Sequence, residues 1–289
     1  MADRKKILVT GANGQLGKEL RDISKEFNQY EFLFLSREDM PIHHYDLVRN
    51  TFDAFKPDYC INCAAYTAVD RAEQESELAF IINAESVGIL AAVSAAHNTR
   101  FIHISTDYVY GGDAEAPYKE TAPTAPQSVY GASKKAGEEE AIKHDPEALI
   151  IRTSWVYSYY GNNFVKTMIK LMKEKEQIGV VSDQKGSPTS AADLAAFIMH
   201  VISFSSWHPG IYNFSNEGEI TWYEFALEIK KLLDSKCLVN PIPTSAYPTP
   251  AKRPAYSVMD KTKIKQVFGY QPKSWNQSLA VCMNRLMEQ

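Results

Sequence analysis

The 289-residue sequence has no strong excess of charge of either sign, since 31 lysines and arginines stand against 35 aspartates and glutamates, for a formal net charge of −4. No stripe of basic residues accompanies this balance, which argues against a protein that binds nucleic acid. No apolar run approaches the length that spans a membrane, and the basic residues 4–6 lead into a strand rather than a signal region. We therefore expect a cytoplasmic protein with no membrane or nucleic-acid partner.

The sequence contains only four cysteines, and their spacing does not predict a metal site. A zinc site at Cys60 and Cys63 would need two more ligands at matching spacing, and Cys237 and Cys282 lie far away along the chain. Because Cys60 and Cys63 fall in an expected strand at odd spacing, their side chains should point to opposite faces of it. We expect free thiols and no bound metal.

Strand and helix patterns alternate through the first half of the chain. Expected strands cover residues 7–9, 31–35, 59–63, 100–104 and 148–152, and expected helices cover residues 16–23, 48–55, 79–96 and 129–144. Such alternation predicts right-handed βαβ units. The fold class is therefore α/β, a Rossmann-like, doubly wound parallel sheet with helices on both faces.

After Trp155 the pattern becomes irregular, with glycine- and proline-rich stretches. We interpret this part as a smaller C-terminal α/β domain that binds the substrate. The predicted NAD(P)-binding domain covers residues 1–155 and about 190–208, and the predicted substrate-binding domain covers residues 156–189 and 209–289. Ligands of such folds gather at the carboxyl ends of the strands, so the chemistry is expected there.

A glycine turn separates the first expected strand from the first expected helix. Its spacing is G-x-x-G-x-x-G, with Gly11, Gly14 and Gly17. Gly11 permits the sharp turn, Gly14 lets the backbone approach a pyrophosphate, and Gly17 lets the helix pack on the sheet. Phosphates would then lie at the helix N-terminus, where unpaired N–H groups favour negative charge. The same glycine spacing also occurs in other tight turns. The prediction of a dinucleotide site therefore depends on the position of the turn between a strand and a helix.

The end of the second expected strand bears on the choice of cofactor. An acidic residue there would bind the ribose 2′-hydroxyl, whereas an arginine accommodates a 2′-phosphate. Ser36 and Arg37 occupy this position, and Asp39 follows two residues later. We predict that NADPH is preferred and NADH tolerated, and that Asp46 and Leu47 line the adenine pocket.

Tyr130 and Lys134 are spaced to lie on one face of an expected helix. An ammonium near the phenol would lower the pKa of Tyr130 toward neutrality, where the phenol can exchange a proton with a carbonyl oxygen. Thr106, at the end of the preceding strand, could hold the same oxygen. The alternative is an exposed helix with a solvated lysine. The glycine turn and the order of the elements favour the catalytic interpretation.

These motifs together resemble the extended short-chain dehydrogenase/reductase family and, within it, the dTDP-4-dehydrorhamnose reductases. The resemblance runs nearly end to end, and its segments are residues 11–17, 62–70, 83, 105–110, 130–134, 152–157, 162–165, 183–189 and 253–257. The segments around Trp155, Gln184 and Arg253 are the most specific to the reductases. Ser158 departs from the family, which often has glycine there, and puts only that local turn in doubt.

The resemblance implies reduction of the 4-keto group of dTDP-4-dehydrorhamnose by NAD(P)H, to give dTDP-L-rhamnose for cell-surface polysaccharide. Tyr130 would donate the proton, Thr106 would hold the carbonyl oxygen, and Lys134 would tune Tyr130 and bind the cofactor ribose. The expected cofactor contacts are Gly11, Asn13, Gly14, Gln15, Leu16, Gly17, Ser36, Arg37, Asp46, Leu47, Ala64, Ala65, Tyr66, Asn83, Tyr130 and Lys134. The expected substrate contacts are Thr106, Asp107, Tyr108, Trp155, Asn163, Gln184 and Arg253.

Three alternatives accompany this interpretation. Related dehydratases have a glutamate after the aspartate that follows the catalytic threonine, but here Asp107 is followed by Tyr108, so dehydration is not expected. A second alternative is a reductase or epimerase of another nucleotide sugar. The third is an NADP-binding regulatory protein similar to the beta subunit of methionine adenosyltransferase. We carry over no metal site from the family, and the resemblance does not decide whether the protein forms a homodimer.

Overall fold

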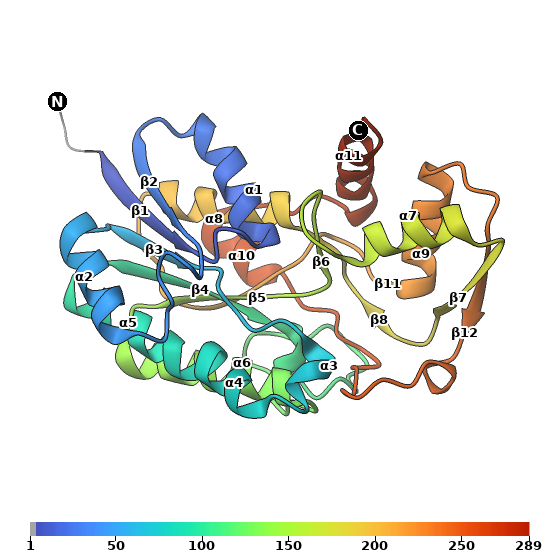
Figure 1. The fold of residues 1–289 in the computed structure, drawn as a ribbon, viewed down its shortest axis with the longest axis horizontal. Helices are drawn as coiled ribbons and strands as arrows, with labels where there is room; N and C mark the ends of the chain where they lie inside the picture. The colour runs from blue at the N-terminus through green and yellow to red at the C-terminus, as the bar shows by residue number, and fades with distance from the viewer. Residues whose placement is uncertain (1–3, 289) are drawn as a thin grey trace.

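A six-stranded parallel sheet forms the centre of the computed structural model, which describes residues 4–288 (Figure 1). The strands are β1 (Lys5–Thr10), β2 (Tyr30–Leu35), β3 (Tyr59–Asn62), β4 (Arg100–Thr106), β5 (Leu149–Thr153) and β10 (Gly210–Phe214). Their order is β10-β5-β4-β3-β1-β2, and every neighbouring pair is parallel. The order reverses next to β1, so a crevice opens at the carboxyl ends of β1 and β3, where doubly wound folds bind ligands.

Helices cover both faces of this sheet, as Figure 1 shows. One face packs on α1 (Gln15–Ile23), α8 (Ala191–Ser203) and α10 (Thr262–Phe268), and the other on α2 (Tyr45–Phe55), α5 (Ser86–Ala96) and α6 (Val129–His144). Alternation along the strands supplies both cores, since Val9 and Ile61 face the first set of helices and Leu8 and Cys60 the second. The predicted α/β fold with a doubly wound sheet is confirmed.

The two neighbouring cysteines lie as the odd spacing predicts. Cys60 packs in one core and Cys63, just past the end of β3, in the other. Both are free thiols, and burial raises the pKa of each well above its usual value. They are therefore inert as nucleophiles and metal ligands at neutral pH.

The helix expected over residues 79–96 is composite. It consists of α4 (Ser76–Phe80), a π-helical turn η2 (Ile81–Glu85) and α5. Ser76–Ala96 is long and apolar enough to cross a membrane by length and composition, unlike the sequence-based expectation, but just over half of its apolar window is buried inside the fold. It packs against α6, which approaches so closely that a Cβ on Gly137 would lie 2.0 Å from the carbonyl oxygen of Asn83.

A second, smaller core lies to the right in Figure 1. Its helices are α7 (Phe164–Glu174), α9 (Trp222–Leu232) and α11 (Trp275–Met287), and its paired strands are β7 (Gln177–Val181) with β12 (Leu238–Ile242), β8 (Lys185–Gly186) with β11 (Ile220–Thr221), and β6 (Val156–Tyr157) with β9 (Thr189–Ser190). Phe225 and Leu279 are fully buried in it. Its role as a substrate-binding domain stays a prediction.

The expected boundary between the two parts needs one correction. The sequence pattern predicts that residues 209–289 belong to the smaller domain, but β10 is hydrogen-bonded to β5 in the central sheet, and α10 packs on it. Phe214 and Phe268 belong to the core on one face of that sheet. The local pattern does not reveal this strand, because the segment follows an irregular stretch and lacks the alternation with long helices that marks the earlier strands.

Replacing Gly137 by alanine tests the close packing of α6 on η2. Alanine is the better helix former by about 1 kcal/mol, but its Cβ would meet the Asn83 carbonyl, which is backbone and cannot move aside. We expect Gly137→Ala to lower the free energy of unfolding by about 1–3 kcal/mol, measured by urea denaturation. Glu139→Ala, at an exposed position of the same helix, should change it by less than about 0.5 kcal/mol. A stabilised Gly137→Ala variant would contradict this account.

Candidate active site

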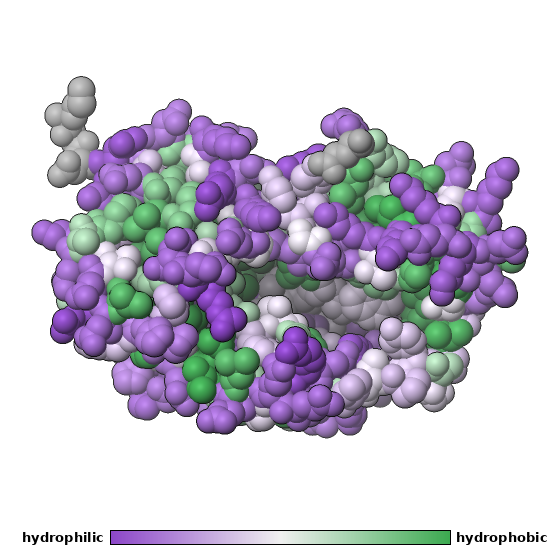
Figure 2. Space-filling model, in the orientation of Figure 1, coloured by the Kyte–Doolittle hydropathy of each residue, from purple (hydrophilic) through white to green (hydrophobic). Residues whose placement is uncertain are grey.

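A cavity of about 890 Å³ opens at the carboxyl ends of the central strands, next to the smaller core. Figure 2 shows the surface hollowed between the two parts of the molecule. Most of the expected site residues line it: Gly11, Asn13, Gly14, Gln15, Leu16, Gly17, Ser36, Arg37, Ala64, Ala65, Tyr66, Thr106, Asp107, Tyr108, Tyr130, Lys134 and Trp155. Residues from the ends of five strands (β1 to β5) and from α6 thus meet at one place.

The glycine turn builds one wall of this cavity. Gly11 has φ of +64°, and a Cβ on it would lie 2.6 Å from the backbone nitrogen of Ala64; a Cβ on Gly17 would lie 2.4 Å from the carbonyl oxygen of Gly11. Helix α1 begins after Gly14, which has no side chain to cap the first N–H groups. These N–H groups border the cavity, so the cradle fits the pyrophosphate of a dinucleotide.

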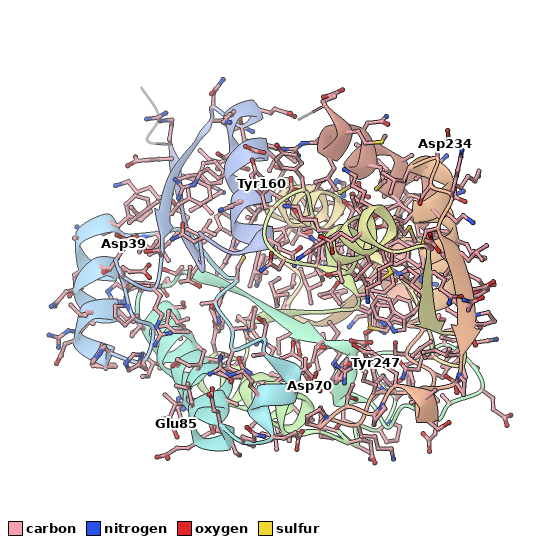
Figure 3. The ribbon with its side chains drawn as sticks, turned by 45° about the vertical axis from the view of Figure 1, so that its right-hand side comes forward. Asp39, Asp70, Glu85, Tyr160, Asp234 and Tyr247 are labelled. Carbon is pink, nitrogen blue, oxygen red and sulfur yellow. The ribbon has the colours of Figure 1, made fainter. Side chains whose placement is uncertain are left out.

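The tip of β2 offers a serine and an arginine to the cavity. The carboxylate of Asp39 is turned away from it, because it accepts a hydrogen bond from the Ser36 backbone at 2.8 Å. This bond lowers the pKa of Asp39, whose position in the turn after β2 is labelled in Figure 3. A ribose in the cavity would therefore meet Ser36 and Arg37 rather than a carboxylate from Asp39.

The prediction that Asp46 and Leu47 line this end of the cavity is wrong. Both lie on the exposed face of α2, where the Asp46 carboxylate is 3.8 Å from the Arg49 guanidinium and Leu47 is 47% exposed. Residues 40–43, just before the helix, line the cavity instead. The helical pattern alone did not show that the chain passes the cavity before α2 begins.

Asn83 acts behind the cavity wall. It is fully buried in η2, and its Nδ2 donates to Ser133 Oγ on α6 and to the Tyr66 carbonyl, each at 3.0 Å. The Tyr66 N–H donates back to Asn83 Oδ1 at 2.8 Å. Asn83 does not line the cavity but fixes the loop after β3, which does. The π-helical turn that places it is a feature often found at functional sites.

Thr106, Tyr130 and Lys134 converge on the floor of the cavity. Thr106 ends β4, and Tyr130 and Lys134 lie in the first turns of α6, whose N-terminus is capped by the Ser128 hydroxyl. The Thr106 hydroxyl donates to Asp107 Oδ1 at 3.1 Å, and the rings of Tyr108 and Tyr130 meet edge to face. A hydroxyl and a phenol therefore border the same space.

The expected effect of Lys134 on Tyr130 is wrong in this arrangement. Burial raises the pKa of Tyr130 to about 12, and a hydrogen bond with Thr106 offsets only part of this rise. Burial also lowers the pKa of Lys134 to about 8. Lys134 Nζ does not contact the phenol but donates to the Ile104 carbonyl at 2.6 Å and lies 3.2 Å from His103 Nε2. Spacing on a helix face did not show which partner the ammonium finds.

A buried ion pair holds α6 in place beneath these residues. Glu138 accepts hydrogen bonds from Arg152 Nε at 2.9 Å and from its NH2 group at 2.6 Å, and both side chains are at most 2% exposed. The Ser105 hydroxyl donates to the same carboxylate, and Arg152 also donates to the Tyr110 hydroxyl at 2.9 Å. Such a fully hydrogen-bonded pair fixes α6 against β4 and β5.

Two more of the expected substrate residues, Trp155 and Asp107, line the main cavity. Trp155 has φ of +46°, lines the cavity and stacks on Trp222 with ring centroids 3.5 Å apart. Burial raises the pKa of Asp107 to about 6, and one of its carboxylate oxygens finds no partner among the described residues. The cavity therefore presents an aromatic plane, and the buried Asp107 carboxyl group lies beside Thr106.

Arg253 lines a neighbouring pocket of about 320 Å³ instead, and Tyr108 lines both. Its guanidinium makes two hydrogen bonds, of 2.9 and 2.8 Å, to the carboxylate of Asp70, which Figure 3 labels. These hydrogen bonds raise the pKa of Arg253 above its ordinary value and lower the pKa of Asp70 below its ordinary value. Arg253 is thus held at the edge of the main cavity rather than in it.

The other two expected substrate residues do not line either pocket. Asn163 caps α7 and donates to Gln15 Oε1 at 2.9 Å, which ties the smaller core to the glycine turn. Gln184 is buried and donates to Thr244 Oγ1 at 3.0 Å. The neighbours Gly161 and Asn162 line the cavity in their place. The Gly-Asn-Asn sequence was the available signal, but it did not single out these two residues.

Sequence reasoning also missed other lining residues. Those inside the quoted family segments, which were the available signal, are Cys63, Thr67, Val69, Ser105, Thr153, Ser154 and Val156. Those outside any quoted segment are Glu38, Met40, Pro41, Ile42, His43, Arg71, Glu75, Leu78, Ile82, Ile104 and Leu194. Arg71 and Glu75 pair with each other on the rim, where the Tyr66 hydroxyl donates to Glu75. No group of histidine, cysteine or carboxylate side chains within residues 4–288 is arranged to hold a metal ion.

Comparisons with known proteins agree with this geometry. The family model described as the RmlD substrate binding domain matches residues 5–288. The dTDP-4-dehydrorhamnose reductase of Aggregatibacter actinomycetemcomitans is 43% identical over 284 residues, which cover 95% of this chain and 97% of that protein. The reductase of the same name from Escherichia coli (strain K12) is 39% identical over 291 residues, covering 97% of each.

A solved structure gives the same result for the fold. The dTDP-4-dehydrorhamnose reductase from Bacillus anthracis, determined in complex with NADP, superposes with a TM-score of 0.94 at 38% identity. The alignment covers 99% of this chain and 100% of that one. The two chains therefore share their fold over the full length.

Two variants test the buried ion pair beneath the cavity. Glu138→Leu leaves the Arg152 guanidinium buried without a counter-ion, and we expect the free energy of unfolding to fall by about 3–5 kcal/mol. Adding Arg152→Met removes the uncompensated charge, so the double variant should recover part of this loss. Urea denaturation of both variants measures the difference. A double variant that is no more stable than Glu138→Leu alone would contradict the role given to the pair.

Proposed function

The chain belongs to the RmlD substrate-binding domain family, the family of the dTDP-4-dehydrorhamnose reductases, and we propose that it reduces the 4-keto group of dTDP-4-dehydrorhamnose to give dTDP-L-rhamnose. The family resemblance inferred from the sequence is thereby confirmed. The observation that carries the proposal is the meeting of Thr106, Tyr130 and the open N-terminus of α1 in one cavity. Cell-surface polysaccharide synthesis in the cytoplasm is the setting we propose.

Tyr130 is the proton donor in this proposal. Because its pKa is raised to about 12, the phenol is protonated at neutral pH and has a proton to give. Thr106 borders the same space, and its hydroxyl would hold the carbonyl oxygen that receives the proton. The two groups together polarise the carbonyl and neutralise the developing alkoxide.

Lys134 would stabilise the phenolate that remains after the proton has left. A phenolate in a buried site needs a positive charge. The Lys134 ammonium is held by the Ile104 carbonyl and His103 and does not contact the phenol, so in this proposal it acts on the phenolate through space. Since the pKa of Lys134 is lowered to about 8, the ammonium is present below that pH and is lost above it. The proposed activity should therefore fall as the pH rises through this value.

NADPH is the cofactor we propose, with NADH tolerated. The glycine turn would hold its pyrophosphate, Ser36 and Arg37 its 2′-phosphate, and Ala64 to Tyr66 the nicotinamide half. When bound, it supplies the hydride for the carbonyl carbon. Trp155, Asp107 and Tyr108 lie where they would contact the sugar, and Arg253 beyond Tyr108 would lie toward the nucleotide diphosphate.

The principal test is turnover of dTDP-4-dehydrorhamnose with NADPH, followed by the loss of reduced cofactor absorbance. Tyr130→Phe removes the proton donor and keeps the ring, so we expect kcat to fall by about 10²–10⁴-fold while NADPH still binds. Tyr45→Phe, at an exposed position on α2, is the matched control and should match the unaltered enzyme. Tight NADPH binding without turnover of any 4-keto sugar would favour a regulatory protein instead.

A second experiment tests the contact to the 2′-phosphate. Arg37→Ala removes the cation at the tip of β2, so we expect the KM for NADPH to rise by about 10- to 100-fold and the KM for NADH to stay nearly constant. Arg49→Ala, on the exposed face of α2, should change neither value. Equal losses with both cofactors, or better turnover with NADH in the unaltered enzyme, would count against the proposed preference.

A further inference from the structure

His103 lies behind the proposed active site and takes no part in the mechanism above. It is fully buried in β4, between two polar neighbours. Its Nδ1 lies 3.1 Å from Asn62 Nδ2, and its Nε2 lies 3.2 Å from Lys134 Nζ. Both ring nitrogens are thus in hydrogen-bonding contact with nitrogen atoms, and each contact needs one donor and one acceptor.

The amide of Asn62 decides the role of the first ring nitrogen. Asn62 Oδ1 accepts from the Thr10 hydroxyl at 2.6 Å and from the Ala64 N–H at 3.2 Å. The amide nitrogen therefore faces His103 and donates to Nδ1. A ring nitrogen that accepts carries no proton, so the proton of the neutral imidazole lies on Nε2.

The second ring nitrogen then points an N–H at Lys134. An ammonium has three donors and no lone pair, so it cannot accept this hydrogen bond. An uncharged amine can accept it and can at the same time donate to the Ile104 carbonyl at 2.6 Å. Only the uncharged form of Lys134 satisfies every donor and acceptor in this arrangement.

A charged Lys134 requires the opposite arrangement. Its ammonium would donate to Nε2, the imidazole proton would lie on Nδ1, and the Asn62 amide would have to turn its oxygen toward the ring. Asn62 Nδ2 could then donate to the Thr10 hydroxyl, which also lies 3.4 Å from the Ala64 N–H. The two arrangements differ by one proton, which enters from water and resides on Nζ, while the imidazole stays neutral in both.

We propose that His103 is a positioning residue that couples the charge of Lys134 to its own tautomer and to the orientation of the Asn62 amide. The coupling reaches the cavity, because Ala64 lines it. It rests on the proposed function and deepens it, since it sets the pH range in which Lys134 carries its positive charge. Burial lowers the pKa of His103 well below its usual value, which keeps the imidazole neutral through the change.

The groups around His103 and Lys134 indicate that Lys134 is the one that gains or loses the proton. Glu138, on the same helix and paired with Arg152 from β5, favours the charged form of Lys134. Cys63, after β3, would favour it only as a thiolate. Cys63 itself stays protonated, because burial raises its pKa. On β4 the ring of Phe101 stacks near His103 and carries no charge. Lys134 is therefore the group expected to titrate near pH 8.

Nitrogen NMR of the histidine-labelled protein tests the coupling without cofactor or substrate. The chain has seven histidines, and the His103 signals are assigned by their loss in His103→Gln. We expect the proton of His103 to move from Nε2 to Nδ1 as the pH falls through about 8, with no imidazolium signal. Lys134→Met should hold one tautomer throughout. A tautomer that stays constant in the unaltered protein, or an imidazolium that forms at this midpoint, would overturn the proposal.

The kinetic test rests on the proposed function and separates positioning from a purely structural role. In His103→Gln the amide oxygen can accept from the ammonium, so the alkaline limb of kcat/KM should move up by about one pH unit. In His103→Leu the ammonium loses this partner in a dry site, so the limb should move down by about as much. His208→Gln should leave the profile unchanged.

A limb that keeps its position in both His103 variants, with only the rate lowered, would show that His103 has a structural role alone and would contradict the proposal. The NMR measurement needs no turnover, so an enzyme inactive on dTDP-4-dehydrorhamnose refutes the proposed function and leaves the coupling to be judged on the tautomer.

Discussion

The Glu138 carboxylate joins helix α6 to two strands of the sheet. It accepts two hydrogen bonds from Arg152 on β5 and one from Ser105 on β4, in a region from which water is excluded. On the other side of α6, Gly137 contacts the turn at Asn83 too closely for any side chain. The helix therefore has one permitted position. Thr106 on β4 and Tyr130 on α6 owe their common cavity to it, and so does the contact between Lys134 and His103.

The sequence predicted the sheet and its first helices well, because alternation along buried strands and the spacing of apolar residues on helices are local patterns. The strand ends at Gly11 and Thr106 indicated part of the cavity for the same reason, and the family resemblance implied most of its other residues. Prediction from the sequence failed where the decisive partner is distant along the chain. Strand β10 joins the sheet from residue 210 onward, and no local pattern near it indicated β5 as its neighbour.

The charge on Lys134 is a second case in which the local pattern does not reveal the decisive partner. A lysine four residues after a tyrosine predicts an ammonium near a phenol, and the structure instead places Nζ between a carbonyl and an imidazole. Burial then acts on both groups in opposite directions, raising the pKa of Tyr130 and lowering that of Lys134. Desolvation depends on how the whole fold closes over the site, so spacing alone could not give its size or sign.

The smaller core completes the cavity from the other side. Trp155 follows β5 with a positive φ, which strains its backbone. Its ring stacks on Trp222 and packs against Gly186, where a Cβ would collide with the ring. Asn163 bonds to Gln15 in the glycine turn, so the two parts meet at the proposed phosphate site. The larger part would thus hold the dinucleotide, and the larger and smaller parts together would hold the sugar substrate.

We propose above all that this cavity reduces a 4-keto sugar with hydride from a nicotinamide cofactor. The most direct measurement is the incubation of dTDP-4-dehydrorhamnose with NADPH deuterated at the transferable position, followed by NMR of the sugar product. We expect dTDP-L-rhamnose with deuterium at carbon 4 of the sugar. Unlabelled or unchanged sugar, or deuterium at any other carbon, would contradict the claim.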